Sequence, residues 1–464
     1  KATNSFDKPI VIVSEDEVRE KEKKRSDEKK TWHFVAKNVR DFAFASSRKF
    51  IWDMMAVKIG GKNIIASSLY PKEGNPLWEE YSTKVVAHTL KVYSKYTFDY
   101  PYPKAVSVHS KNQGMEYPMI CWNYGRPNED GSYSDRTKYA MISVIIHEVG
   151  HNFFPMIVNS DERQWGWMDE GLDSFVQYLA EQEFEQDYPS RRGEPSKIIR
   201  YMSGDQDFIS PIMSNPENVF QLGPNAYSKP ATALNILRET IMGPELFDFS
   251  FKTYAKRWKF KHPTPEDFFR TMEDASAVDL DWFWRGWFYS TDVVDIGVKS
   301  VDNYIVSEKP SKEIDSILSK YGMTANDLNP TVFMDKNPND LLKSSELESD
   351  LTSSFEGLDV ALGDDKKLPK YFYEIKFEKP GGLVMPIIVD YTYEDGTKER
   401  IKYPVQIWRK NDSIVKRLIT SDKKLIGVEL DPDAETADIN LNNNSWPEKN
   451  TISDFDKFKE KIKG

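Results

Sequence analysis

Residues 147–171 read HEVGHNFFPMIVNSDERQWGWMDEG and hold two of the 6 histidines of the chain. His147 and His151 are four positions apart with Glu148 directly after the first, and Glu170 follows nineteen positions after the second. Side chains at i and i+4 of an α-helix project from one face, about 6 Å apart along the axis. The two imidazoles can therefore meet a single metal ion, and the segment predicts a metal site built on a helix.

The donor types in this segment favour zinc. Zinc accepts imidazole nitrogen and carboxylate oxygen at about 2.0–2.2 Å, and a catalytic zinc site keeps one position for water. Glu170, at the start of the next expected helix, can supply the third ligand beside His147 and His151. Glu148 lies about 100° further round the helix than His147, where it can take a proton from that water. We therefore expect one zinc ion, with Glu148 as the general base.

A histidine outside such a pattern is usually a surface or core residue. We expect this of the four others, which are His33, His88, His109 and His262. The HExxH pair differs from them, because two histidines and a carboxylate seldom coincide at this spacing by chance in a chain with so few histidines.

Composition excludes several classes of protein. The formal net charge of −11 disfavours a nucleic-acid binder, which normally presents a basic face. No apolar run approaches the roughly 20 residues that a membrane-spanning helix needs. The single cysteine, Cys121, permits no disulfide within the chain. With 39% hydrophobic residues the chain can build a large core, and its length suggests about three domains.

The periodicity of apolar residues changes along the chain. β-Branched and aromatic residues in partial alternation predict strands at 31–45 and 49–59, and a helical spacing follows at 75–98. From residue 135 to about residue 292 the pattern is mainly helical. A polar, acidic stretch then leads into short strands separated by turn signals, which are typical of a small β-sandwich.

Three motifs together resemble the aminopeptidase N family of zinc peptidases, the gluzincins, which includes the leukotriene hydrolases. The sequence HEVGHNFF…WMDEGLDSF, an HExxH followed after eighteen residues by Glu, is similar to the zinc motif of that family. GMEYP at 114–118 resembles its GAMEN-type exopeptidase strand, and PNAYSKPATALNIL at 224–237 resembles the segment that contains its catalytic tyrosine. The resemblance covers about residues 30–295.

The resemblance implies roles for eight residues: zinc ligation by His147, His151 and Glu170, acid–base catalysis by Glu148, donation to the oxyanion by Tyr227, binding of the free α-amine of the substrate by Glu116, and backbone contacts to the peptide from Gly114 and Met115. A carboxylate near zinc suits an exopeptidase, because its pairing with the terminal ammonium leaves only the first carbonyl within reach of the metal. Ser174, four residues after Glu170, either supports the ligands or faces the domain interior.

The same resemblance implies an α+β fold with a thermolysin-like, mostly helical catalytic domain, a C-terminal β-sandwich and remnants of an N-terminal β-domain. Domains are then expected at 1–55 (final strands of the N-terminal β-domain), 56–295 (zinc catalytic domain), 296–366 (linker with short helices) and 367–464 (small β-sandwich). Too few residues precede Gly114 to hold a whole N-terminal β-domain, so we expect a more open cleft than in relatives.

Two positions depart from the family pattern. Tyr117 stands where the exopeptidase motif usually has Asn, which concerns fine specificity rather than the adjacent glutamate. Asp169 replaces the Asn that often precedes the zinc glutamate.

The leading hypothesis is a zinc-dependent aminopeptidase acting on peptide substrates. Three alternatives stay open: an endopeptidase, favoured if Glu116 points away from the cleft, a non-peptidase hydrolase such as an epoxide hydrolase, and a binding protein with an inactive site. The sequence does not reveal the first-position specificity or the oligomeric state. Because the chain opens without an initiator methionine or a leader, we expect a processed, exported bacterial protein, with the cytoplasm as the alternative.

Overall fold

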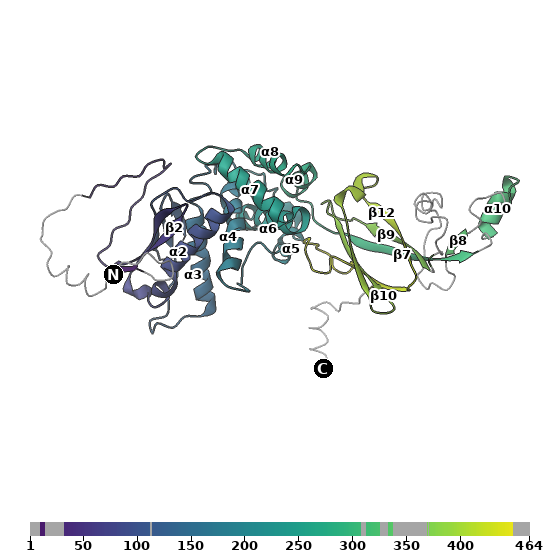
Figure 1. The fold of residues 1–464 in the computed structure, drawn as a ribbon, viewed down its shortest axis with the longest axis horizontal. Helices are drawn as coiled ribbons and strands as arrows, with labels where there is room; N and C mark the ends of the chain where they lie inside the picture. The colour runs from purple at the N-terminus through teal and green to yellow at the C-terminus, as the bar shows by residue number, and fades with distance from the viewer. Residues whose placement is uncertain are drawn as a thin grey trace. The chain divides into compact units, whose positions relative to one another are not determined.

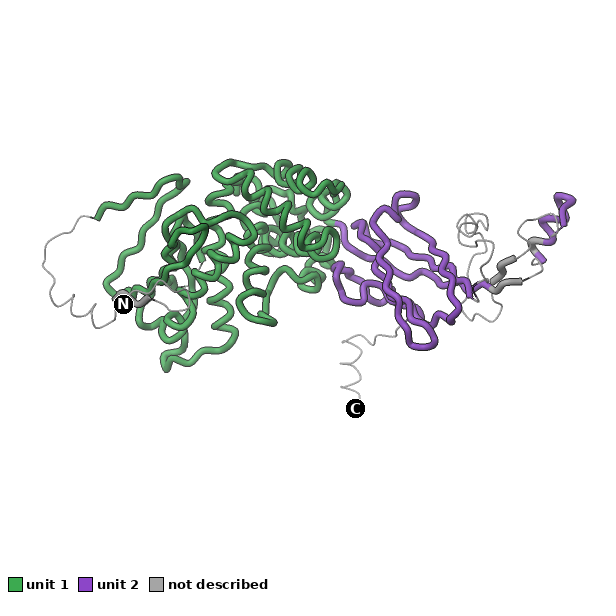
Figure 2. Tube along the Cα trace, in the orientation of Figure 1, with its two compact units in different colours: residues 1–291 green, residues 292–464 purple. Residues whose placement is uncertain are grey.

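The computed structural model describes residues 10–13, 32–111, 114–307, 312–324, 333–336, 369 and 371–448. The chain divides into two compact units, Lys1–Thr291 and Asp292–Gly464 (Figure 2). Each unit is described by itself. No helix in the described ranges has the length and apolar character that crossing a bilayer requires.

The first unit contains a six-stranded sheet. Its strand order is β1-β2-β3-β4-β6-β5, with bounds β1 Ile10–Val13, β2 Ile51–Ile59, β3 Lys62–Tyr70, β4 Lys104–His109, β6 Ile120–Asn123 and β5 Met115–Tyr117. Strands β2 and β3 form an antiparallel hairpin whose turn uses Gly60 and Gly61, both at positive φ. Strands β3, β4 and β6 run parallel, and β5 returns antiparallel to β6 at the edge of the sheet.

Helices make up the rest of the first unit (Figure 1). They are α2 Leu77–Tyr96, α3 Asp135–Gly150, α4 Leu172–Phe184, α5 Ile199–Met202, α6 Lys229–Ile236, α7 Pro244–Trp258, α8 Pro265–Ser276 and α9 Asp281–Trp287. Three further turns are π-helical: η2 Trp167–Gly171, η6 Gly223–Ser228 and η7 Leu237–Met242. Helix α2 contacts the sheet through β2 and β3 and also contacts α3 and α4, so it joins the sheet to the helices that carry the HExxH segment and Glu170.

Helix α3 has a clear start and a fully buried second half. The Ser134 hydroxyl accepts a hydrogen bond from the backbone N–H of Thr137 at 3.2 Å, which satisfies one of the free donors of the first turn. Every residue from Ile145 to Gly150 is buried. The helix therefore delivers the HExxH segment from a packed interior rather than from a loop.

A cluster of aromatic rings holds the turn η2 in place. Trp167, the first residue of that turn, lies 4.8 Å from Phe288 and 5.7 Å from Phe268 between ring centroids. It also stacks on Phe269 with an interplanar angle of 7°. Such ring pairs add about 0.5–1.5 kcal/mol each beyond the area that they bury, so the segment next to Glu170 is rigidly supported.

The second unit consists mainly of two four-stranded sheets, with orders β11-β10-β13-β14 and β12-β9-β7-β8. The strands are β7 Gly297–Ser307, β8 Phe333–Lys336, β9 Tyr371–Glu378, β10 Ile387–Tyr393, β11 Lys398–Tyr403, β12 Ile414–Ser421, β13 Leu425–Leu430 and β14 Ser445–Trp446, with one helix, α10 Lys312–Lys320. All pairings within both sheets are antiparallel. A hydrogen bond from Leu425 N to the Tyr373 hydroxyl, at 3.0 Å, joins the two sheets.

The structure shows the expected mixture of helix and sheet, but it differs from several expected boundaries. Residues 32–45 form no strand, although a strand was expected at 31–45, and the side chains of Trp32 and Phe44 are 74% and 64% exposed. Strand β2 crosses the expected boundary at residue 55, because its pairing with β3 makes it part of the first unit's sheet. Residues 297–307, expected to begin a linker, form β7, which pairs with β9 through buried residues such as Val301. The remainder of the expected linker, apart from 312–324 and 333–336, lies outside the described residues.

Candidate metal centre

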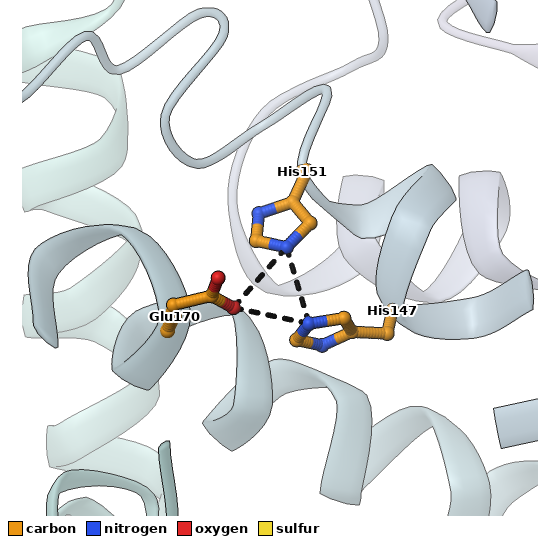
Figure 3. Close-up of side chains that lie close together, drawn as sticks. All are labelled: His147, His151 and Glu170. Atoms are coloured by element: carbon orange, nitrogen blue, oxygen red, sulfur yellow. Dashed lines mark hydrogen bonds and ion pairs between the residues drawn. The ribbon is translucent and has the colours of Figure 1, made fainter. Parts of the chain in front are cut away.

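Helix α3 and the turn η2 bring the three expected metal ligands together (Figure 3). Nε2 of His147 lies 3.1 Å from Oε2 of Glu170 and 3.2 Å from Nε2 of His151. Nε2 of His151 lies 3.4 Å from the same glutamate oxygen. Two imidazole nitrogens and one carboxylate oxygen thus form a triangle around one point, which a single ion can occupy.

The outer nitrogen, Nδ1, of each histidine ring faces a hydrogen-bond acceptor. This contact orients the ring so that its inner nitrogen, Nε2, faces the centre of the triangle. Nδ1 of His151 faces the backbone oxygen of Phe154 at 2.9 Å, an atom that can only accept. Nδ1 of His147 lies 3.1 Å from Oε1 of Gln177 and 2.7 Å from Oδ2 of Asp173. With a proton on each Nδ1, both Nε2 atoms carry lone pairs that point at each other across 3.2 Å. A shared cation resolves this repulsion, so the residues present fit a metal ion such as zinc.

The electrostatics of the centre also favour a cation. Burial opposes a charge on His147, but the carboxylates around it, Asp173 first, raise its pKa to about 10. Burial acts against the ionised form of Glu170 as well, yet His151 and His147 hold the pKa of that carboxyl well below its usual range. The negative charge gathered around two imidazoles is therefore large enough to hold positive charge in a buried place.

Glu148 is buried beside the triangle. Its Oε2 has no hydrogen-bond partner within the part of the chain that the structure describes, and burial raises the pKa of the carboxyl to about 7. A Cβ at Gly114 would collide with the Glu148 carboxylate, so this glycine lets the backbone pass directly against it. The carboxylate is thus available to a proton donor such as water.

Tyr227 comes from the second π-helical turn, η6, and stacks on His147. The two rings lie 5.8 Å apart between centroids with an interplanar angle of 28°. Burial, followed by the Glu170 carboxylate, raises the pKa of Tyr227 well above its usual value, so the phenol keeps its proton as a donor. The two turns pack closely at Gly171, where a Cβ would lie 2.9 Å from the backbone oxygen of Ala226.

Glu116 lies on the other side of the triangle, on the edge strand β5. A carboxylate oxygen of Glu116 lies within 4.8 Å of a ring nitrogen of His151 and of a carboxylate oxygen of Asp169. Gly114 and Met115 precede it at the same edge of the sheet, and Met115 is 40% exposed. The carboxylate thus lies close to His151, one of the three expected ligands.

Two side chains behind the ligands were not anticipated. Asp173 is fully buried and, besides its contact with His147, accepts a hydrogen bond from the Tyr93 hydroxyl at 2.9 Å. A Cβ at Gly150 would collide with the Asp173 carboxylate and the Tyr93 hydroxyl. Ser174, the residue singled out instead, accepts a hydrogen bond from Arg192 at 3.3 Å. The signal for Asp173 was its position three residues after Glu170, which a regular helix places on the same side.

A cavity of about 460 Å³ opens next to the centre. It is lined by Gly114, His147, Glu148 and Tyr227, and further out by Arg191 and Arg192, among other residues. A group bound there can contact the free carboxylate of Glu148 and the phenol of Tyr227 together.

Comparisons with known proteins agree with this geometry. Residues 81–287 match the peptidase family M1 domain. Glutamyl aminopeptidase of Sus scrofa is 28% identical over 190 residues, which are 39% of this chain and 19% of that protein. Aminopeptidase N of Lactococcus lactis subsp. lactis is 20% identical over 243 residues, which are 49% of this chain and 28% of that protein. The chain thus spans less than a third of the length of these relatives.

The fold is also similar to a solved structure. Aminopeptidase A of Legionella pneumophila, crystallised with aspartic acid, has a TM-score of 0.53 at 12% identity, over 84% of this chain and 38% of that chain. The segment that matches the family domain contains all eight residues to which roles were assigned from the sequence. These findings support the aminopeptidase N family of zinc metallopeptidases, to whose M1 domain residues 81–287 of this chain are similar.

Proposed function

We propose that this chain is a zinc-dependent aminopeptidase that removes N-terminal residues from peptides. The observation that carries the proposal is the convergence of His147, His151 and Glu170 within 3.4 Å of one another. The relatives named glutamyl aminopeptidase and aminopeptidase N support the same class of reaction.

His147, His151 and Glu170 would hold one zinc ion. When bound, zinc supplies Lewis acidity that polarises a carbonyl group and makes a nearby water more acidic. The chain's own part is to fix the ligand geometry. Asp173 and the Phe154 carbonyl do this from behind, since each engages the outer nitrogen of one histidine.

Glu148 would act as general base and then as general acid. Its unpartnered oxygen accepts a proton from the attacking water while the water oxygen bonds to the carbonyl carbon. The same carboxyl then gives that proton to the leaving nitrogen as the C–N bond breaks. One free amino acid and a peptide shorter by one residue result, and Glu148 returns to its ionised form.

Glu116 and Tyr227 would define where the substrate sits. The Glu116 carboxylate pairs with the terminal ammonium, which places the first carbonyl at the centre. Tyr227, which stays protonated, donates to the oxygen that gains charge in the transition state. One donor of this kind typically lowers the barrier by about 2.7–4 kcal/mol.

One assay tests this proposal. A panel of aminoacyl chromogenic amides is offered with a free amine or with a blocked amine, each with and without a chelator. We expect hydrolysis of the free amides alone, loss of hydrolysis with the chelator, and recovery on addition of zinc. Equal rates on free and blocked substrates would instead identify an endopeptidase, in which Glu116 has no role as an amine anchor.

A further inference from the structure

The cavity beside the metal centre carries a positively charged wall. Arg191 and Arg192 both line it, although the chain as a whole has a net charge of −11. We propose that these two arginines select peptides that carry a carboxylate on the first or second residue after the scissile bond. This inference rests on the proposed aminopeptidase function, and it names the class of substrate that the site prefers.

Arg192 lies close to the reacting groups. Its guanidinium carbon is 4.5 Å from the centroid of the Tyr227 ring, and that ring is 5.8 Å from the His147 ring. The sum of these two distances is about the length of three extended residues. A carboxylate on the residue that follows the scissile bond, or on the next one, can therefore reach Arg192 while the scissile carbonyl stays at the metal centre.

The two sides of the centre give the direction of the substrate. Glu116 lies within reach of His151 and Asp169, whereas Arg192 approaches through Tyr227 from the side of His147. A peptide whose ammonium pairs with Glu116 then passes the centre toward His147. The cavity that contains the arginines accordingly receives the part of the peptide that becomes the leaving amine.

The charge of Arg191 is available to a ligand, and that of Arg192 is shared in part with the buried carboxylate of Glu181. Arg192 donates a hydrogen bond to the Ser174 hydroxyl at 3.3 Å, and neither arginine has an ion pair among the described residues. The carboxylate of Glu181 shares the cavity wall, but it accepts hydrogen bonds from Gln177 at 2.8 Å and from Ser190 at its other oxygen.

Guanidinium groups recognise carboxylates through paired hydrogen bonds and bind them more specifically than an ammonium does. Two carboxylates satisfy this chemistry: the side chain of Asp or Glu, and the free C-terminus of a dipeptide or tripeptide. Both present the same group to the arginines, so the experiment has to separate them.

Four dipeptides with one common, well-cleaved first residue separate the two sources. The second residue is Glu or Gln, and the C-terminus is free or amidated. For the wild-type chain we expect kcat/KM to be about tenfold higher for a peptide with a carboxylate at either place than for the amidated Gln peptide. Faster cleavage of the amidated Glu peptide would show that the arginines bind the side-chain carboxylate, and faster cleavage of the Gln peptide with a free C-terminus would show that they bind the C-terminal carboxylate.

In the variants Arg192→Gln and Arg191→Gln, the ratio of kcat/KM for the peptides with a carboxylate to kcat/KM for the amidated Gln peptide should be close to one. Arg200→Gln, an exposed arginine outside the cavity, is the matched control and should leave the ratio unchanged. Since Arg191 is exposed, Arg191→Glu should fold normally and should shift preference toward a peptide with Lys at the second position.

Two results overturn the inference. The wild-type chain can cleave all four dipeptides equally, or Arg192→Gln can lower kcat/KM by the same factor for all four, which would make Arg192 only a support for Tyr227. Failure of the proposed function looks different, because no peptide with a free amine is then cleaved. In that case calorimetric binding of the same four peptides to the wild-type chain decides the inference: tighter binding of those with a carboxylate supports it, and equal binding overturns it.

Discussion

At the scale of single residues, the metal centre depends on groups that do not touch the metal. Asp173 fixes one histidine from behind and is itself held by Tyr93. At Gly114 the Glu148 carboxylate occupies the space that a Cβ would need. At Gly150 the side chains of Asp173 and Tyr93 occupy that space. The geometry of the reacting groups is thus set as much by these neighbours as by the ligands.

Replacing Asp173 by Asn should weaken zinc binding by about 10–100-fold. The amide keeps the shape of the carboxylate but removes the negative charge next to His147 Nδ1, 2.7 Å away. Zinc affinity is measured by competition with a chromogenic chelator. Ser174→Ala is the control, because Ser174 contacts Arg192 and not the histidines; equal weakening in both variants would contradict a specific role for Asp173.

Replacing Gly114 by Ala should lower kcat at least about tenfold and leave zinc affinity nearly unchanged. The added Cβ must displace the Glu148 carboxylate, whose Oε2 has no hydrogen-bond partner among the described residues. A general base typically raises the rate about 10²–10⁴-fold, and a displaced base loses much of that factor. Steady-state kinetics and metal analysis on the same preparation check this. If Gly114→Ala further slows an enzyme that already carries Glu148→Gln, the alanine acts through something other than the base.

At the scale of elements, two π-helical turns supply Glu170 and Tyr227. A π turn holds more residues than an α turn and is common at functional sites. These turns sit at the starts of α4 and α6 and pack on each other at Gly171. The ring cluster around Trp167 then ties the first turn to the helical interior.

Replacing Trp167 by Ala should cost about 3–5 kcal/mol in the free energy of unfolding and should also weaken zinc binding, because Glu170 lies three residues further along the same turn. Trp287→Ala, equally buried but on α9, should cost similar stability with zinc affinity retained. Urea unfolding and chelator competition measure the two quantities. Equal zinc affinity in both folded variants would show that the turn holds its shape without its tryptophan.

The sequence was sufficient to predict some elements and not others. HExxH has a spacing that brings two histidines to one face only on a helix, so α3 and the three expected ligands could be predicted directly. Nothing in local propensity distinguishes a π turn from an α turn, and the apolar residues of 32–45 mimic a strand without a partner strand in the described chain.

At the scale of the whole molecule, the two units carry buried groups with opposite responses to pH. In the first, burial and then Arg126 lower the pKa of His109 to about 4. Arg126 donates to His109 Nε2 at 3.2 Å, which requires the neutral ring. In the second, burial raises the pKa of Asp438 to about 7, although it accepts hydrogen bonds from the backbone of Ile296 and Asn440.

Lowering the pH from 7.5 to 5 should therefore destabilise the first unit through His109 and stabilise the second through Asp438. Unfolded histidine takes up a proton below about pH 6.5 while folded His109 does not, so stability falls as pH drops toward 4. Folded Asp438 binds its proton near pH 7 while the unfolded chain does so near 3.8, so stability rises over the same interval.

Calorimetry of the wild-type chain and of two variants checks these signs. His109→Gln should reduce the acid-induced loss in the first unit, and Asp438→Asn should reduce the gain in the second, each by about 1–3 kcal/mol. Each variant is the control for the other, because its substitution lies in a different unit. If neither substitution changes the pH dependence of unfolding, groups other than His109 and Asp438 cause that dependence.

The wide turns η2 and η6 mean that the proposed chemistry depends on residue count as well as on residue identity. Removing one residue from either turn would let a regular helix close while every side chain before the deletion rotates by about 100° relative to those after it. All the sequence motifs would survive, yet Glu170 or Tyr227 would face elsewhere. A deletion of one residue in either turn should therefore abolish the proposed activity even though every motif residue is kept.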